Sequence, residues 1–247
     1  MASMKVELID HMGSDLSVVN AARVSFDKES AWEETEGRCV DLPCPFDFCE
    51  TKDCTWSEYK LSDKDTKLIG YLARHNHWSP FAHCFASFRI KAPIFVARQL
   101  VKHQVGLAWN EVSRRYVDSE PEFYVPEAWR KRAENVKQGS SDETLSSEME
   151  DGYRPLDDYA FLLKEAREYY RYLINAGVCP EQARMVLPQS MMTEWIWSGS
   201  LYAFARVCHL RLDSHTQKET QVIAQGIAEK MELLFPISWK ALLNDHS

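Results

Sequence analysis

The residues best suited to chemistry lie between positions 98 and 115. Arg98 and Lys102 are four residues apart, as are Gln99 and His103, so on a helix each pair would share one face. A loop that carries an amide, a carboxylate, a hydroxyl and two guanidinium groups is expected to follow, with Asn110, Glu111, Ser113, Arg114 and Arg115. Such a group can hold both a phosphate and the edge of a base. The plainer alternative is a solvated helix face followed by a charged loop.

The bulk composition is compatible with a small-molecule site. The chain has 247 residues, is 45% hydrophobic and carries a net charge of −8, which is typical of a globular protein. An acidic balance argues against a nucleic acid polymer as partner, whereas a nucleotide needs only a few placed cations. The sequence contains no apolar run of membrane-spanning length and no leader pattern, which predicts a soluble cytoplasmic protein with no membrane partner.

The elements expected around this segment are a strand and a helix. Residues 86–92 alternate apolar and polar side chains, which predicts a half-buried strand. Pro93 suits the first turn of a helix, and this helix is expected to end near Gly106. Residues 33–60 show no clear period and are expected to form an inserted Cys-rich loop, and the polar stretch 137–152 a mobile connection.

The C-terminal third is expected to be helical. Helical spacing runs through 156–173, with Gly177 at the position of a C-cap, and further helices are expected over 181–187, 200–210 and 217–234. Shorter signals predict a strand over 4–10, a helix capped by Ser14 or Asp15, and a helix through 68–72. Strands early and helices late predict an α+β fold, with one domain over 1–247.

The segment around His103 resembles the signature of flavin-dependent thymidylate synthases, an Arg-His-Arg triplet separated from a serine by seven residues. The blocks 21–26, 75–81, 91–99, 183–188 and 210–217 also agree with that family in order and approximate spacing. Agreement in several blocks in the same order favours membership of this family over the alternative of a solvated charged surface. The resemblance implies an antiparallel sheet with packed helices and a homotetramer with active sites between subunits.

The resemblance also implies the ligands and the residues that bind them. These ligands are FAD, NADPH, 5,10-methylenetetrahydrofolate as the one-carbon donor, and dUMP. The flavin would contact Ser25, His77, Ser79, Lys102, His103, Gln104, Asn110, Glu111, Ser200, Tyr202 and Arg206. The nucleotide would contact Gln99, Lys102, Glu111, Val112, Ser113, Arg114, Arg115, Arg184 and Arg211.

Arg211 is the expected catalytic residue. Uracil C5 becomes nucleophilic when negative charge builds on the O4–N3 side, and a fixed guanidinium facing the ring would stabilise that charge. In this family the reduced flavin relays the methylene group and supplies the hydride, so no attacking cysteine is needed. Ser113 is therefore expected to be a substrate contact.

Three departures from the family pattern fall on the flavin side. The triplet reads Lys102-His103-Gln104, eight residues separate Gln104 from Ser113, and the later flavin stretch reads Ser200-Leu-Tyr202, with Arg206 able to replace the lost cation. The expected product is dTMP. The alternatives are 5-hydroxymethyl-dUMP, if water closes the reaction, or a non-catalytic nucleotide-binding relative that has lost flavin.

No metal site is predicted. Cys39, Cys44, Cys49 and Cys54 are evenly spaced, whereas structural zinc ligands usually come in closer pairs. His75, His77 and His83 lack a carboxylate partner nearby. His215 is expected to be a structural hydrogen-bonding group, and Trp195 and Trp197 are expected to pack in a core or interface.

Overall fold

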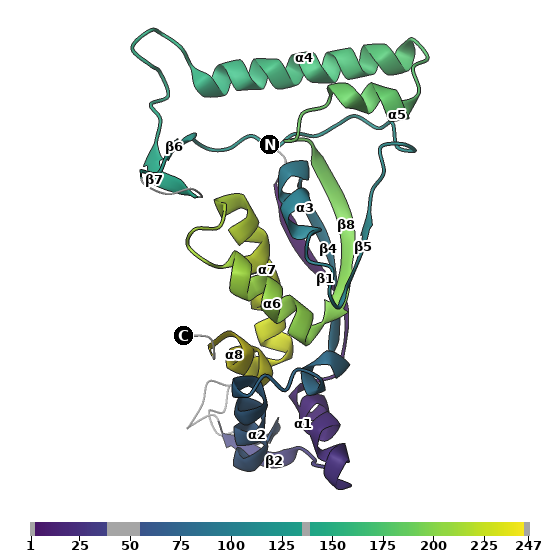
Figure 1. The fold of residues 1–247 in the computed structure, drawn as a ribbon, viewed down its shortest axis with the longest axis vertical. Coiled ribbons are helices and arrows are strands. Elements are labelled where there is room, and N and C mark those ends of the chain that lie inside the picture. Colours follow the sequence, from purple (N-terminus) through teal and green to yellow (C-terminus); the bar gives the residue numbers. More distant parts are fainter. Residues whose placement is uncertain (1–2, 39–54, 135–138, 245–247) are drawn as a thin grey trace. The chain divides into compact units, whose positions relative to one another are not determined.

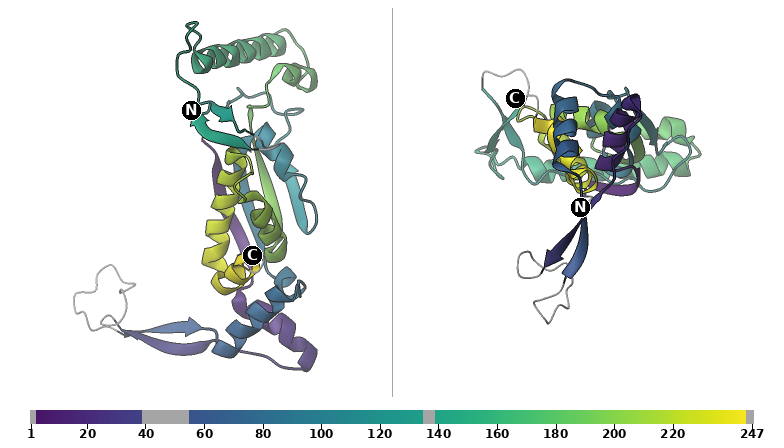
Figure 2. Two further views of the ribbon diagram at one scale, coloured as in Figure 1. Left: turned by 60° about the vertical axis from the view of Figure 1, so that its left-hand side comes forward. Right: turned by 90° about the horizontal axis from the view of Figure 1, so that it is seen from below.

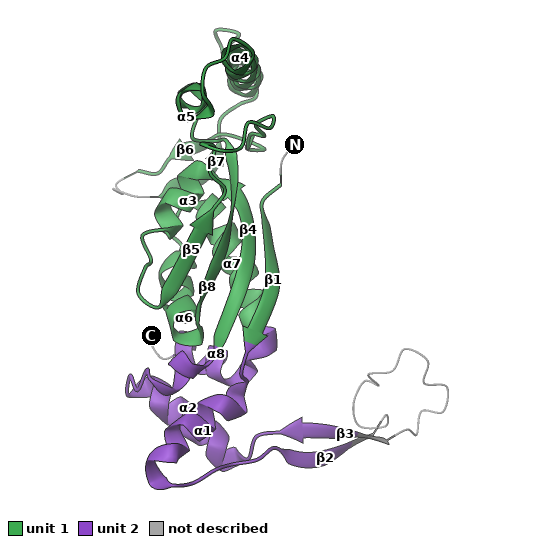
Figure 3. Cartoon of the chain, turned by 90° about the vertical axis from the view of Figure 1, so that its right-hand side faces the viewer, with its two compact units in different colours: residues 1–11, 85–231 green, residues 12–84, 232–247 purple. Residues whose placement is uncertain are grey.

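The computed structural model describes residues 3–38, 55–134 and 139–244 (Figure 1). The chain divides into two compact units, shown in different colours in Figure 3. Unit 1 comprises Met1–His11 and Phe85–Met231, and unit 2 comprises Met12–Cys84 and Glu232–Ser247.

The centre of unit 1 is a four-stranded sheet. Its strands are β1 (Lys5–Met12), β4 (Phe85–Pro93), β8 (Met192–Ser200) and β5 (Leu107–Glu111), in the order β1-β4-β8-β5. Strand β8 pairs antiparallel with both β4 and β5. The prediction of an antiparallel sheet with helices is confirmed, as is the strand over 86–92. The expectation of strands early and helices late was wrong, because the central strand β8 lies late in the chain.

One face of this sheet is covered by α3 (Ile94–Leu100), α6 (Leu201–Arg211) and α7 (Lys218–Leu234), which lie behind the strands in Figure 3. Phe88 of β4 is paired with Trp197 of β8, and both are fully buried. Phe204 of α6 packs edge-on against both rings, with centroids 5.0 and 5.4 Å away. The apolar alternation of β4 thus faces the helices that carry the candidate site residues.

The opposite face of the two central strands is polar. Arg89 Nε donates to Glu194 Oε1 at 2.7 Å, and the hydroxyls of Ser87 and Ser198 lie 2.8 Å apart. Trp195 and Trp197 of β8 lie on the other face, toward the helices, where both are buried.

The helix after β4 is shorter than expected. It ends at Leu100, and a turn over 101–106 leads into β5 through Gly106, whose φ of +76° is accessible to glycine at little cost. Lys102 and His103 therefore lie beyond the helix. The prediction that they share helical faces with Arg98 and Gln99 was wrong. Asn110 and Glu111, expected on a loop, lie on β5.

The remaining elements of unit 1 are α4, a short ribbon and two short helical turns. Helix α4 (Pro155–Asn175) ends as predicted at Gly177, whose N–H donates to the carbonyl of Ile174 at 3.0 Å. It is followed by α5 (Pro180–Ala183) and the 3-10 turn η3 (Arg184–Val186). Strands β6 (Arg130–Arg132) and β7 (Ser140–Thr144) pair antiparallel, so part of the stretch expected to be a mobile connection is a strand.

Unit 2 contains α1 (Asp15–Arg23), η1 (Val24–Phe26), α2 (Asp63–Arg74), η2 (Pro80–His83) and α8 (Pro236–Asn244). The predicted start of α1 is confirmed. The buried carboxylate of Asp15 accepts from the backbone N–H groups of Ile237 at 3.0 Å and Ser238 at 2.9 Å, so it also caps α8.

The segment expected to be an irregular loop begins and ends in strands. Strands β2 (Glu33–Arg38) and β3 (Thr55–Lys60) form an antiparallel ribbon, visible side by side in Figure 2. The side chains of Glu33, Glu34, Glu58, Tyr59 and Lys60 are exposed. Because the described side chains of the ribbon are exposed or part-exposed, its sequence shows no apolar alternation there, and the strands were not predicted.

Candidate functional site

Unit 1 contains a cavity of about 740 Å³ between the end of α3 and the connection from α6 to α7. Its wall is mostly polar and combines two amides, a guanidinium, two imidazoles, a carboxylate and a hydroxyl. The lining residues are Gln99, Gly139, His209, Leu210, Arg211, Asp213, His215, Thr216 and Gln217. Gln99 and Arg211, two of the residues expected to bind the nucleotide, therefore share one cavity.

Arg211 is fixed by His103. It lies in the last turn of α6, where the helix dipole favours a cation, and its Nε donates to Nε2 of His103 at 3.0 Å. Since a guanidinium cannot accept a hydrogen bond, Nε2 of His103 must be the acceptor and the imidazole proton must lie on Nδ1. Burial and the positive charges of Arg211 and Arg206 lower the pKa of His103 below its usual value of 6.5. His103 is thus held neutral, and it fixes the position of Arg211.

The connection after α6 is held by short-range hydrogen bonds. His215 Nδ1 lies 3.0 Å from Asp213 Oδ1, which also accepts from the His215 backbone N–H at 2.8 Å. These bonds, the backbone one first, lower the pKa of Asp213. Thr216 Oγ1 donates to the carbonyl of Leu210 at 3.0 Å. His215 thus makes the hydrogen bonds expected of it, and it also lines the cavity beside Arg211.

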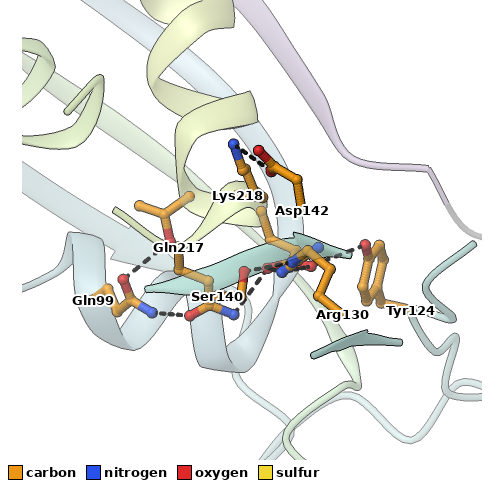
Figure 4. A network of polar contacts seen from close by, with 9 residues as sticks. Gln99, Tyr124, Arg130, Ser140, Asp142, Gln217 and Lys218 are labelled. Carbon is orange, nitrogen blue, oxygen red and sulfur yellow. Dashed lines mark hydrogen bonds and ion pairs between the residues drawn. The ribbon is translucent and has the colours of Figure 1, made fainter. Parts of the chain in front are cut away.

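Gln99 is held by α7 and the residue that precedes it (Figure 4). Its Nε2 donates to Oε1 of Gln217, and its Oε1 accepts from the hydroxyl of Thr220 at 3.1 Å. Sequence reasoning assigned no role to Gln217 or Thr220. The block 210–217, which agrees with the family pattern, is the one signal that could have drawn attention to Gln217.

The turn after β5 carries the expected phosphate ligands. Ser113 Oγ accepts from Arg115 Nε at 3.1 Å, and the Arg115 guanidinium lies 5.0 Å from the ring centre of Tyr116. Arg114 donates to the carbonyl of Ser119. Arg115 and Val112 are exposed. In the described part of the chain, no hydrogen bond or ion pair links this turn to Gln99 or Arg211.

The edge strand before this turn orients Glu111. Its carboxylate accepts from Thr193 Oγ1 at 2.8 Å and from Trp109 Nε1 at 3.2 Å. Trp109 stacks on Trp195, with ring centroids 4.4 Å apart. Glu111 is therefore held in place while it stays accessible to solvent. Asn110 is also exposed.

The other expected site residues of unit 1 are dispersed. Lys102 and Gln104 are exposed on the turn after α3, and Arg206 is exposed on α6, next to the half-buried Tyr202. Ser200 is buried and caps α6, because its hydroxyl accepts from the N–H of Ala203 at 3.2 Å. Arg184 is exposed and donates from Nε to the carbonyl of Glu181 at 3.2 Å.

Unit 2 has a separate cavity of about 770 Å³. Ser25, His77 and Ser79 all lie in its wall, together with the aromatic rings of Tyr71 and Trp78. Its cations are Arg23, which is paired with the buried Asp65, and Lys28. Aromatic rings, hydroxyls and cations are the side chains that a planar ring system joined to phosphates requires. Three residues expected at the flavin are therefore gathered in a cavity whose chemistry fits that group.

No metal-binding cluster of His, Cys, Asp or Glu occurs within 3–38, 55–134 and 139–244. The four cysteines weighed for zinc, Cys39, Cys44, Cys49 and Cys54, lie outside these residues. In the same described ranges, no helix is both long and apolar enough to span a bilayer.

Known proteins are similar to this chain over nearly all of its length. The family described as "Thymidylate synthase complementing protein" matches residues 7–237. The flavin-dependent thymidylate synthase of Kosmotoga olearia is 36% identical over 242 residues, which cover 97% of this chain and 90% of the relative. That of Thermus thermophilus is 36% identical over 236 residues, which cover 96% of this chain and 74% of the relative.

A solved structure is also similar. The UMP/dUMP methylase PolB from Streptomyces cacaoi, bound with 5-Br UMP, superposes with a TM-score of 0.73 at 28% sequence identity. The superposition covers 99% of this chain and 96% of PolB.

Proposed function

Because the chain belongs to the flavin-dependent thymidylate synthase family, we propose that it transfers a one-carbon unit from 5,10-methylenetetrahydrofolate to C5 of dUMP and releases dTMP. The observation that carries this proposal is the cavity shared by Gln99 and Arg211, with Arg211 held by a neutral imidazole. A pyrimidine seated there would meet a cation and an amide of fixed position.

Arg211 would supply the electrostatic part of the reaction. C5 is nucleophilic in the polarised form of uracil that carries negative charge on its O4–N3 side, and a guanidinium that needs no reorganisation would stabilise that charge. C5 of this polarised ring then donates the electron pair that forms the bond to the one-carbon unit. Only Nε of Arg211 is engaged within the described residues, so its two terminal nitrogens are available to the uracil edge. The C5 proton must then leave, which gives the reaction a measurable signature.

FAD is the proposed cofactor, with NADPH as reductant. When bound, the reduced flavin relays the one-carbon unit and supplies the hydride. In unit 2, Ser25, His77 and Ser79 would hold it, supported by their shared cavity. In unit 1 the candidate contacts are Lys102, His103, Gln104, Asn110, Glu111, Ser200, Tyr202 and Arg206. The Ser200 hydroxyl is already used by a helix cap.

A homotetramer would complete the nucleotide site. The dianionic phosphate of dUMP requires cations, and Arg114, Arg115 and Arg184 do not line the cavity of Gln99 and Arg211. We propose that a second subunit brings these arginines, with Ser113, to the phosphate. Their exposure or part-exposure supports this arrangement.

Product analysis tests the proposal. Purified protein is incubated with FAD, NADPH, methylenetetrahydrofolate and either dUMP, UMP or dCMP, and the nucleotide products are identified by mass spectrometry. The proposal predicts dTMP from dUMP. A 5-hydroxymethyl product would instead support the hydroxymethylase alternative. A colourless protein that neither binds FAD nor changes any nucleotide would support the non-catalytic alternative.

A further inference from the structure

A chain of side-chain hydrogen bonds extends from Gln99 to a buried carboxylate in the first turn of α7. Gln217 donates from Nε2 to Oε2 of Glu219 at 3.0 Å, while its Oε1 accepts from Nε2 of Gln99. Glu219 is 5% exposed. Figure 4 shows part of this network, from Gln99 and Gln217 to Arg130 and Tyr124. On its other side Glu219 pairs with Arg130 of β6 and accepts from the hydroxyl of Tyr124 at 3.5 Å.

Glu219 is ionised and firmly held. Arg130 Nη2 donates to both carboxylate oxygens at 2.9 Å, and Arg130 Nε donates to Ser140 Oγ at 2.8 Å. Burial alone would raise the pKa of Glu219. Hydrogen bonds from its own backbone N–H, Arg130 and Gln217, together with the charge of Arg130, outweigh that effect and lower the pKa below 4.5. An ionised carboxylate can only accept hydrogen bonds.

This acceptor fixes the orientation of two amides in turn. Gln217 must direct its nitrogen toward Glu219, since its oxygen would be repelled there. The oxygen of Gln217 then faces Gln99, so Gln99 must direct its own nitrogen toward Gln217 and its oxygen toward Thr220. The Thr220 hydroxyl cannot set this direction, because a hydroxyl can donate or accept.

We propose that Glu219 is a positioning residue that acts through Gln217 to fix which end of the Gln99 amide faces the nucleotide. The inference rests on the proposed function, because Gln99 is there a nucleotide ligand. In its fixed orientation Gln99 has one N–H and one lone pair left for a ligand, and reversal of the amide exchanges their places. Glu219 thereby determines the hydrogen-bonding pattern of the cavity wall without contact with the ligand.

The test is a double-mutant cycle on dUMP affinity, measured by calorimetry on FAD-loaded protein. Glu219→Gln keeps the shape and an oxygen for Arg130, but its new amide N–H faces Gln217 and favours the reversed orientation of both glutamines. In the reversed orientation Gln99 loses one hydrogen bond to the nucleotide and presents a mismatched group in its place, so dUMP should bind about ten-fold more weakly. In a Gln217→Met background, where the connection is cut, Glu219→Gln should change affinity by less than about two-fold.

The control is Asp142→Asn. Asp142 pairs with Lys218 at 3.4 Å beside the network, outside the connection from Glu219 to Gln99, so this variant should bind dUMP like the wild type. Equal affinity of Glu219→Gln and wild type would overturn the positioning role. So would a loss of the same size in both backgrounds, since that result indicates a general structural effect. Wild-type protein that fails to bind dUMP would instead overturn the proposed function itself.

Discussion

Arg211 and His103, 108 positions apart in the chain, are joined by a hydrogen bond of 3.0 Å from Nε to Nε2. This bond requires a neutral imidazole, and burial together with the positive charges of Arg211 and Arg206 favours that form by lowering the pKa of His103. The proposed reaction depends on this pair, because the guanidinium must be both charged and fixed before charge develops on the pyrimidine.

Replacement of Arg211 by lysine should slow the reaction. Lysine keeps a positive charge but lacks the planar donor fork and the Nε bond to His103. We expect kcat for dTMP formation to fall about a hundred-fold, as for loss of one preorganised donor. Arg171→Lys serves as the control, because Arg171 is exposed and paired with Glu120 on the surface, and its kcat should stay near that of the wild type. A drop in kcat of less than about three-fold for Arg211→Lys would argue against the assigned role.

Activity should fall in acid as His103 becomes protonated. The folded-state pKa of His103 lies below 6.5, so His103 accepts from Arg211 at neutral pH and loses this ability as pH falls through its lowered pKa. The same shift means that the unfolded chain binds this proton more readily, so stability also declines as pH falls below 6.5. The measurement is kcat/KM against pH.

Replacement of Arg206 should shift the acid limb of the profile of kcat/KM against pH in a known direction. Arg206→Gln removes one of the charges that lower the pKa of His103, so the acid limb should move to higher pH. Lys164→Gln, at an exposed position of α4, should leave the acid limb of the profile in place. If the limb of Arg206→Gln coincides with that of the wild type, His103 does not control the acid side.

The ion pair between Arg130 and Glu219 should contribute to the stability of the fold. Arg130→Met leaves the carboxylate of Glu219 buried without its cation, which is expected to cost about 3 kcal/mol of unfolding free energy. The neighbouring Lys131 pairs with Glu143 in solvent, so Lys131→Met should cost less than about 1 kcal/mol. Urea titrations of the two variants compare these values. Similar losses for both would show that burial of Glu219 has no energetic consequence.

Flavin binding should depend on the cavity of unit 2. His77→Ala removes a polar side chain from its wall, and we expect about ten-fold weaker binding of FAD in a fluorescence titration. His83→Ala is the matched control, since His83 is also exposed and lies on η2 but does not line the cavity. Unchanged FAD affinity in His77→Ala would remove the residue from the flavin site.

Elements with one buried face were predictable from the sequence. The alternation of β4 and the helical period of α7 correspond to their buried faces. Helix α4 was also predicted from its period, although Leu162 and Tyr169 of that pattern are exposed. Strand β8 was missed because burial of Trp195 and Trp197 was read as general packing, without a strand. The end of α3 was missed because the turn through Gly106 is required by the pairing of β5 with β8, a contact between distant segments.

The site was predictable only where single residues match a pattern. Arg211 and Gln99 were identified by resemblance, and they do share a cavity. The ion pair between Arg130 and Glu219, which is linked to Gln99 through Gln217, was not predictable. The two residues lie 89 positions apart, and no local sequence pattern marks either of them. Their relationship exists only after β6 and α7 are brought together in the fold.

Release of tritium from dUMP labelled at C5 tests the central claim most directly, because a one-carbon unit cannot replace the C5 proton without expelling it. Wild-type protein supplied with FAD, NADPH and methylenetetrahydrofolate should release tritium into water in step with dTMP formation, and Arg211→Lys should slow both about a hundred-fold. Retention of the label by the wild type under conditions where dUMP and FAD are both bound would contradict the account.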